Sequence, residues 1–312
     1  MKRLLLLASL TGSLVAHDVI GWIPPYQLGA SRKALAHRAG AVTADQWLSR
    51  MGLQFWILTP EGKLAYAERG ETITDAEVAH FRNWGKAKGV PVLLTVYNHD
   101  GKIWDWQRAR SAFALHRDAL VTSLVDEMTR HGLDGIDLDL EGEGYLDADR
   151  EAYGAFVKAL STAVHAKGKL LTVDSFHSPC FNAPNMAWWG DWQGQVDGIH
   201  SMGYGDLYEA NAASFTPEGG KPCAEGAAIF RFSWQIEWAK GKGFRPAQVL
   251  LGIPGWQYEW GGAALPKHLE DLAKVGAGCA VWDIPSTLGS DKDPRWGSET
   301  AWAALARFKR QK

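Results

Sequence analysis

Short apolar runs alternate along the chain with longer stretches in which apolar residues recur every three or four positions. The runs are rich in Val, Ile and Leu, which is typical of strands that are buried on both faces. The longer stretches have the periodicity of helices with one buried face. This alternation predicts a parallel sheet that is covered by helices. The apolar runs lie at residues 19–23, 53–58, 90–97, 134–141, 169–173, 196–202, 249–253 and 279–282.

Helices are expected between these runs, and the count of eight strands favours a closed (β/α)8 barrel, the TIM barrel, in a single domain. An open, doubly wound sheet is the alternative, but no Gly-x-Gly-x-x-Gly loop follows the first strand. Thr74, Asp75 and Glu77 supply good capping chemistry for the start of one helix. The expected helices span residues 32–50, 74–88, 108–131, 147 or 149 to 167, 227–240, 265–275 and 299–309.

One run differs from the others because acidic residues occupy alternate positions within it. Residues 134–141 read Asp-Gly-Ile-Asp-Leu-Asp-Leu-Glu. Since side chains alternate faces along a strand, Asp137, Asp139 and Glu141 share one face, and only Ile and Leu lie on the other. Neighbouring carboxylates repel, and desolvating a charge is costly unless it is paired or protonated. We therefore expect this face to line the mouth of the barrel and to hold catalytic carboxylates.

A calcium-binding loop is a competing interpretation, since Asp-x-Asp-x-Glu-Gly resembles the start of an EF-hand. However, Leu138 and Leu140 are apolar where such a loop is polar. Ala148 also stands at the twelfth position, where the loop needs a bidentate Glu. No cluster of His or Cys has the spacing of metal ligands, so neither a metal nor a cofactor is expected.

The acidic stretch resembles the Asp-x-x-Asp-x-Asp-x-Glu signature of glycoside hydrolase family 18, the chitinases and endo-β-N-acetylglucosaminidases. All four acidic positions match, as Asp134, Asp137, Asp139 and Glu141. The resemblance implies substrate-assisted hydrolysis, in which the acetamide oxygen of the substrate is the nucleophile. It also implies that Glu141 is the general acid and that Asp139 orients the acetamide. Asp137 is expected to share a proton with Asp139, because adjacent carboxylates do not ionise together readily.

Other strand ends extend the resemblance but also depart from it. The family's Met-x-Tyr-Asp motif on the sixth strand is matched by Met202 and Tyr204, but a Gly stands in place of the Asp and Asp206 follows one place later. The resemblance implies that Tyr204 donates a hydrogen bond to the acetamide carbonyl. Trp282 matches the Trp that forms the floor of the family's sugar site, whereas its Ser-x-Gly-Gly motif is absent from residues 95–98. These departures indicate an outlying subgroup.

Polar and aromatic residues gather at the ends of the predicted strands, where barrels of this kind hold their functional groups. They suit a polar ligand with flat apolar faces, such as a sugar ring. The preferred function is hydrolysis of glycans that contain β-linked N-acetylglucosamine, chitin-type or related. Two alternatives stay open: a sugar-binding lectin on the same barrel, and a glycosidase that uses Glu141 with a second carboxylate such as Asp174 or Asp206. The expected substrate-binding residues are Trp22, Asn98, Met202, Asp206, Trp256 and Trp282.

The N-terminus has the form of a secretory signal peptide. Residues 1–16 comprise a basic start and an apolar run that is too short to span a bilayer. We expect cleavage before His17, a barrel domain at residues 17–312, and a secreted or periplasmic protein. The chain has 33 Lys and Arg against 35 Asp and Glu, and loss of Lys2 and Arg3 leaves 31 against 35, a net charge of −4. No basic patch indicates a nucleic-acid partner, so a monomer that binds neither nucleic acid nor membrane is expected.

Tryptophan and cysteine usage add two further expectations. The 312 residues include 16 Trp, of which about half are expected in the core and the rest in stacking on sugars. Three cysteines in an exported chain predict one disulfide and one leftover thiol. Cys180 and Cys223 lie in Pro-containing loops, whereas Cys279 lies within an apolar strand. We therefore expect a Cys180–Cys223 disulfide.

Overall fold

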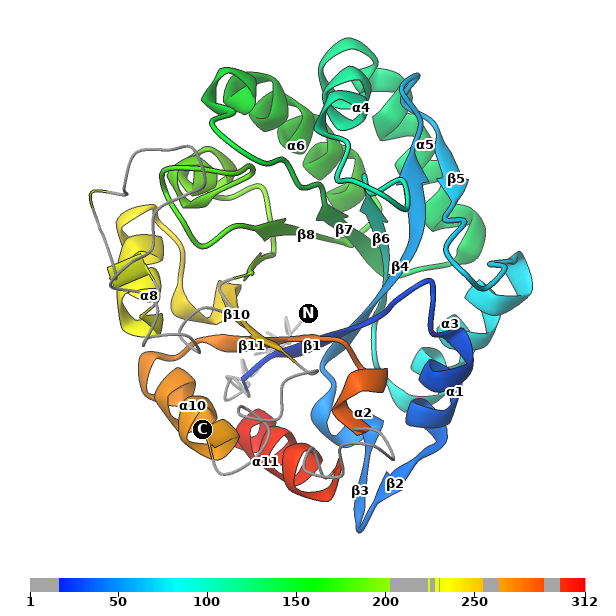
Figure 1. Cartoon of the computed structure of the whole chain (residues 1–312), viewed down its shortest axis with the longest axis vertical. Coiled ribbons are helices and arrows are strands. Elements are labelled where there is room, and N and C mark those ends of the chain that lie inside the picture. The colour runs from blue at the N-terminus through cyan, green and yellow to red at the C-terminus, as the bar shows by residue number, and fades with distance from the viewer. Residues whose placement is uncertain are drawn as a thin grey trace, which may run out of the picture.

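The computed structural model describes residues 17–202, 224, 228–229, 231–254, 264–288 and 298–311. Eight parallel strands close into a barrel, because β1 pairs with β11 on one side and with β4 on the other (Figure 1). This arrangement confirms the predicted (β/α)8 barrel. In order around the barrel the strands are β1 (Val19–Ile23), β4 (Arg50–Leu58), β6 (Val92–Tyr97), β7 (Gly135–Asp139), β8 (Leu170–Ser175), β9 (Gly198–Ser201), β10 (Val249–Pro254) and β11 (Gly278–Trp282).

Helices form an outer ring around the strands (Figure 1). The predicted cap of one helix is present, since the hydroxyl of Thr74 accepts a hydrogen bond from the backbone N–H of Glu77 at 3.3 Å. In the described part of the chain, no helix is both long enough and apolar enough to cross a membrane. The α-helices are α1 (Leu28–Ala36), α2 (Ala44–Trp47), α3 (Asp75–Lys88), α4 (Trp106–Arg110), α5 (Arg117–His131), α6 (Arg150–His165), α8 (Phe232–Gly241), α10 (Ala264–Val275) and α11 (Ser298–Arg310).

The helix predicted over residues 32–50 is wrong. The segment forms α1, then a two-stranded hairpin of β2 (Arg38–Ala39) and β3 (Val42–Thr43), and then the short α2. α1 ends at Ala36, before His37 in extended conformation, and Gly40 then turns the hairpin with φ 58°, a left-handed conformation that suits glycine. β4 follows at once, so it begins at Arg50, three residues before the predicted strand.

The helix predicted over residues 108–131 is interrupted. It consists of α4, one π-helical turn at Ser111–Leu115, and α5, which begins after His116. Further short elements were not predicted. Two of them are β5 (Leu64–Tyr66), which pairs antiparallel with β4, and a 3-10 segment at Met186–Trp192. Both lie in stretches without a clear apolar period, so the hydrophobic pattern gave no signal for them.

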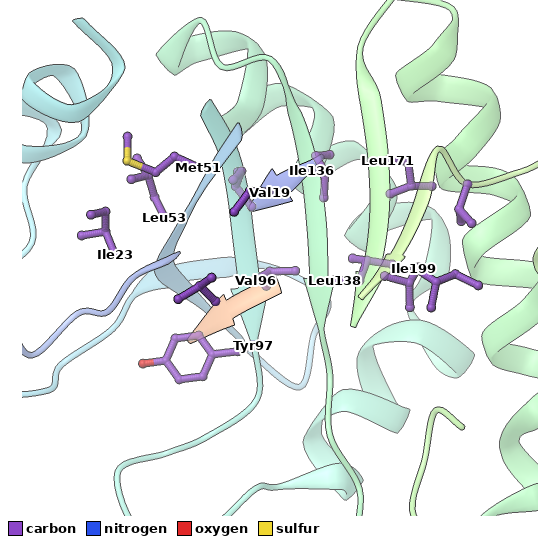
Figure 2. Packing of buried hydrophobic residues seen from close by; sticks show 14 of the residues in the cluster. Val19, Ile23, Met51, Leu53, Val96, Tyr97, Ile136, Leu138, Leu171 and Ile199 are labelled. Atoms are coloured by element: carbon purple, nitrogen blue, oxygen red, sulfur yellow. The ribbon is translucent and has the colours of Figure 1, made fainter. Parts of the chain in front are cut away.

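The strands alternate between an apolar outer face and an inner face that is polar toward the mouth. Ile136 and Leu138 of β7 are fully buried in the main core between the strands and the helices, with Leu171 and Ile199 of the next two strands (Figure 2). A smaller apolar cluster fills the barrel interior and consists of Ile20, Trp22, Leu93, Leu250 and Ala280. Asp137 and Asp139 therefore point inward, as the period-two pattern predicts.

Tryptophans occur both in the core and at the cavity. Among the described residues, six are fully buried, and three of these lie in the Met186–Trp192 segment. Trp22, Trp104 and Trp282 instead line the cavity at the mouth of the barrel. The fully buried set is Trp47, Trp56, Trp188, Trp189, Trp192 and Trp302.

Candidate active site

A cavity of about 380 Å³ lies at the mouth of the barrel, next to the acidic residues at the carboxyl end of β7. Asp137 is 0 % exposed and Asp139 is 3 % exposed, whereas Glu141 lies two residues beyond the end of the strand and is partly exposed. Asp139 and Glu141 thus face the cavity, and Asp137 lies beneath them. The cavity is lined by Trp22, Tyr26, Gln54, Arg69, His99, Trp104, Asp139, Glu141, Asp174, Phe176, His200, Ser201, Met202, Ala280 and Trp282.

Asp137 is surrounded by hydrogen-bond donors. Nε1 of Trp22 donates to Oδ2 at 2.8 Å, and the hydroxyl of Thr95 donates to the same oxygen at 3.0 Å. The hydroxyl of Thr172 donates to Oδ1 at 2.5 Å, and Nδ1 of His200 lies 3.2 Å from Oδ1. Burial opposes ionisation, but the imidazole of His200 and these hydrogen bonds outweigh it and hold the pKa of Asp137 below its usual value. Asp137 is therefore a carboxylate.

Gly52 makes room for two of these donors. It is the register partner of Trp22 on the neighbouring strand β4. A Cβ atom at Gly52 would lie 2.4 Å from Cδ1 of Trp22 and 2.6 Å from the hydroxyl oxygen of Thr95, closer than atoms pack. The absence of a side chain on Gly52 thus lets both donors reach Asp137.

Asp139 and Glu141 have fewer donors and hold a proton. Nε2 of Gln54 donates to Oδ2 of Asp139 at 2.6 Å. Burial, and next the charge of Asp137, raise the pKa of Asp139 to about 7 despite this bond. Burial also raises the pKa of Glu141 well above its usual range, and the charge and hydrogen bonding of Asp139 raise it further. The expectation that Asp137 shares a proton with Asp139 is corrected accordingly, because the donors around Asp137 leave that proton to Asp139 and Glu141.

Asn98, which we expected to bind substrate, lies outside the lining of the cavity. Its side chain is 0 % exposed and does not line the cavity. Its Nδ2 donates to the carbonyl of Glu141 at 2.8 Å, and its Oδ1 accepts from the N–H of Glu141 at 2.8 Å. The next residue, Gly142, exchanges backbone hydrogen bonds with Ala183 at 2.8 and 2.9 Å. Asn98 therefore clamps the backbone of Glu141 and leaves only its side chain free to move.

The other predicted site residues divide between the cavity and the undescribed segments. Trp22, Met202 and Trp282 line the cavity as expected, and the rings of Trp22 and Trp282 lie 5.9 Å apart at 45°. Cys279 is a free and buried thiol. Four predicted residues lie outside the described part of the chain, so their roles and the disulfide stay predictions: Tyr204, Asp206, Cys223 and Trp256.

Several cavity residues were missed by the sequence-based prediction. Gln54 and His200 were not singled out, although each is a polar residue at an inward-facing position of a buried strand. That period-two signal could have found them. Arg69 and Trp104 lie in loops and have no such signal. Arg69 stacks on the ring of Tyr26, 5.0 Å from its centroid.

A parallel barrel whose carboxylates gather at the carboxyl ends of its strands, in a cavity walled by indole rings, has the architecture of a barrel glycosidase. The chain belongs to the glycosyl hydrolases family 18, whose family model matches residues 56–305. It is therefore a glycoside hydrolase.

Solved structures show the same fold at low sequence identity. A class V chitinase from Pseudomonas fluorescens Pf-5 is similar with a TM-score of 0.67 and 19 % identity over 93 % of this chain and 98 % of its own. A chitinase from Chromobacterium violaceum has a TM-score of 0.66 and 16 % identity over 95 % and 100 % of the two chains. The Bacillus cereus spore cortex-lytic enzyme SleL has a TM-score of 0.65 and 13 % identity over 93 % and 73 %. No curated protein sequence matches the chain significantly.

Proposed function

We propose that this glycoside hydrolase cleaves β-linked N-acetylglucosamine-containing glycans with retention of configuration, and that the acetamide of the substrate is the nucleophile. The observation that supports this proposal is the proton-holding pair of Asp139 and Glu141 at the cavity. A general acid must be protonated at working pH, and the pKa of Glu141 is raised well above its usual range by burial and by Asp139. In the described part of the chain, no ionised carboxylate of the cavity faces Glu141, which fits a reaction in which the substrate supplies the nucleophile.

In the proposed reaction, Glu141 protonates the oxygen of the leaving sugar. The acetamide oxygen then attacks the anomeric carbon, and positive charge develops on the acetamide nitrogen. Asp139 accepts the N–H of the acetamide once Glu141 takes up the shared proton, and the carboxylate of Asp137 beneath it stabilises the developing charge. Water then opens the cyclic intermediate, with Glu141 as base. Tyr204 is proposed to donate a hydrogen bond to the acetamide carbonyl.

A two-carboxylate mechanism with Asp174 as nucleophile is less well supported. Asp174 lines the cavity, but burial, together with the charges of Asp137 and Asp139, raises its pKa well above its usual range. A protonated carboxyl does not attack an anomeric carbon. The lectin alternative is likewise disfavoured, because a binding site has no need of a protonated acid held by a clamped backbone.

The acetamide is tested by removing it. Acetylated and fully deacetylated oligosaccharides of the same length should be compared as substrates, and only the acetylated one should be cleaved. A cyclic thiazoline mimic of the intermediate should inhibit, because species that resemble the transition state bind far more tightly than substrate. Equal cleavage of the deacetylated oligosaccharide would reject the substrate-assisted mechanism and leave Glu141 as a possible acid.

The polymer that contains the sugar is a separate question. Solved structures with this fold include chitinases and a spore cortex-lytic enzyme by name. Purified protein should therefore be assayed on chitin oligosaccharides, peptidoglycan and high-mannose glycopeptide. We favour chitin-type oligosaccharides, and the largest kcat/KM among the three identifies the substrate class.

We also propose that residues 1–16 direct export of the protein, which then acts as a monomer outside the cytoplasm. The basic start and short apolar run support this proposal. N-terminal sequencing of exported protein should find His17 or a nearby residue first, and an intact Met1 would reject it. Light scattering should give the mass of one chain.

A further inference from the structure

A buried Asp–His pair lies beside the acidic residues of β7. Asp174 on β8 and His200 on β9 are register partners on adjacent strands. Nδ1 of His200 lies 2.7 Å from Oδ1 of Asp174 and 3.2 Å from Oδ1 of Asp137. The side chains of all three residues are at most 5 % exposed. One imidazole nitrogen therefore stands between two carboxyl groups that are cut off from bulk water.

The position of the hydrogen follows from the chemistry of these groups. An ionised carboxylate only accepts hydrogen bonds, so the contact with Asp137 requires a hydrogen on Nδ1, which lies 2.7 Å from Oδ1 of Asp174 and 3.2 Å from Oδ1 of Asp137. Asp174 holds a proton, because burial and the charges of Asp137 and Asp139 raise its pKa well above its usual range, so it adds no negative charge beside Asp137. The pair thus gives Asp137 a donor without bringing a second net negative charge next to it.

We propose that the Asp174–His200 pair is a positioning device that holds Asp137 ionised and so confines the mobile proton to Asp139 and Glu141. The inference rests on the proposed function, because it explains how the general acid keeps its proton. If Asp137 took up that proton, Asp139 would lose the negative neighbour that favours its protonated form. Glu141 would then face an ionised Asp139 with no proton to share between them.

The described residues around His200 are otherwise largely apolar. Leu250 of β10 is its register partner on the far side, and the ring of Trp22 from β1 meets its edge at 5.2 Å between centroids. Both belong to the apolar cluster of the barrel interior, with Ile20, Leu93 and Ala280. Among the described residues, the titratable groups that face His200 are thus Asp137, Asp139 and Asp174.

A metal ion is the competing explanation of this cluster. Ligand atoms of Asp137, Asp174 and His200 lie within 4.8 Å of one another, close enough to share an ion. Hydrogen bonds account for the same geometry, since 2.7 and 3.2 Å are ordinary N–H···O separations. Thr172 and Trp22 also occupy both oxygens of Asp137. The hydrogen-bond account therefore predicts activity that is unchanged after exhaustive dialysis against a chelator.

The test compares the pH dependence of kcat/KM for the wild type, His200→Asn and Asp174→Asn, with an acetylated chitin oligosaccharide as substrate. In His200→Asn, the loss of the imidazole raises the pKa of Asp137. The acidic limb of the kcat/KM profile therefore shifts to higher pH. We expect that limb to move up by about one pH unit, because Asp137 loses one of the hydrogen bonds that favour its charged form. Asp174→Asn should move it less, because His200 remains. The control is His165→Asn, which removes a surface imidazole 3.0 Å from Asp197 and should leave the profile unchanged.

A second measurement does not need activity. Aspartate labelled with ¹³C at the carboxyl carbon reports each titration by NMR, and Asp137→Asn identifies the signal of Asp137. In folded His200→Asn protein, that signal should titrate at a higher pH than in the wild type. An unchanged titration, or activity that chelation abolishes and a divalent ion restores, overturns the inference. Neither result touches the role of Glu141. If the wild type cleaves none of the tested glycans, the proposed function fails, and the NMR titration still decides the role of the pair.

Discussion

The deep and the shallow carboxylates of β7 differ in charge although both are buried. Asp137 receives donors from Trp22, Thr95, Thr172 and His200 and is ionised. Asp139, two residues further along the same face, receives one from Gln54, and its pKa rises to about 7. Burial is thus common to both positions, and the number of donors decides which of them holds a proton. Asp137 thus carries a fixed negative charge beneath the cavity, and Asp139 and Glu141 hold a transferable proton at the cavity.

Removal of the transferable proton should have the largest effect. Glu141→Gln keeps the shape of the side chain but cannot donate, so kcat should fall by roughly 10²–10⁴-fold or more while the affinity for oligosaccharide is retained. Initial rates and titration calorimetry measure the two quantities. Glu151→Gln changes an exposed glutamate of α6 and serves as the control. A Glu141→Gln variant with a near-normal rate would remove Glu141 from the mechanism.

The raised pKa of Asp139 predicts how stability depends on pH. The folded state keeps its proton up to about pH 7, whereas an unfolded Asp loses it near 3.8. This contribution to stability is therefore present in full at low pH and is lost as the pH rises from about 4 to about 7, on the order of a few kcal/mol. Asp139→Asn should flatten that decline in urea unfolding and slow cleavage, whereas Asp126→Asn on the exposed side of α5 should keep the decline. An equally steep decline in Asp139→Asn protein would show that other groups cause it.

The predicted Cys180–Cys223 disulfide allows the loops to be perturbed without a change in the barrel interior. Cys180 follows β8 in the loop that leads to the Met186–Trp192 segment and is not one of the donors of Asp137. Reduction should lower the free energy of unfolding by about 2–4 kcal/mol, because the unfolded chain gains freedom. The titration of Asp137 should not change. Mass mapping of exported protein checks the bond itself, and two free thiols would reject it.

Crowding the deep site tests whether donors fix the charge of Asp137. Gly52→Ala should push Trp22 and Thr95 away from Asp137 and lower the free energy of unfolding by about 1–3 kcal/mol, as overpacked interiors do. Loss of those two hydrogen bonds should also raise the pKa of Asp137, which carboxyl NMR can measure. Gly168→Ala provides a comparison at a left-handed turn with nothing within 4 Å of its Cβ, where any loss is due to backbone strain alone. If only stability changes in Gly52→Ala, the donors from β1 and β6 do not set that charge.

Loosening the clamp on Glu141 should have the smallest effect. Asn98→Ala frees the N–H and carbonyl of Glu141, so the acid is held less well while the cavity wall is unchanged. We expect kcat to fall about 10-fold, equivalent to about 1.4 kcal/mol, with little change in KM. Steady-state kinetics separate the two constants. Asn83→Ala, at an exposed position on α3, should match the wild type, and a rise in KM alone for Asn98→Ala would restore Asn98 as a binding residue.

Much of the fold follows from local patterns that the sequence states directly. Most of the buried strands are rich in branched apolar residues, and the capping residue Thr74 marks the start of α3. The prediction failed over residues 32–50, where α1 ends at Ala36 and a hairpin turned by Gly40 follows inside an otherwise helical pattern. It also failed where an element is held by a partner strand, as β5 is by β4. Such elements depend on contacts that no window of sequence contains.

The sequence by itself determined that three acids lie on one inward face of a strand and that Glu141 comes last, because a strand has a side-chain period of two. It also fixed the family through those same positions. Only the tertiary structure decided the charge of each acid. The donors of Asp137 come from β1, β6, β8 and β9, which are distant in sequence and meet only when the barrel closes. Asn98 likewise became a clamp because β6 lies beside β7. A pKa depends on distances and desolvation in space, and these exist only in the folded chain.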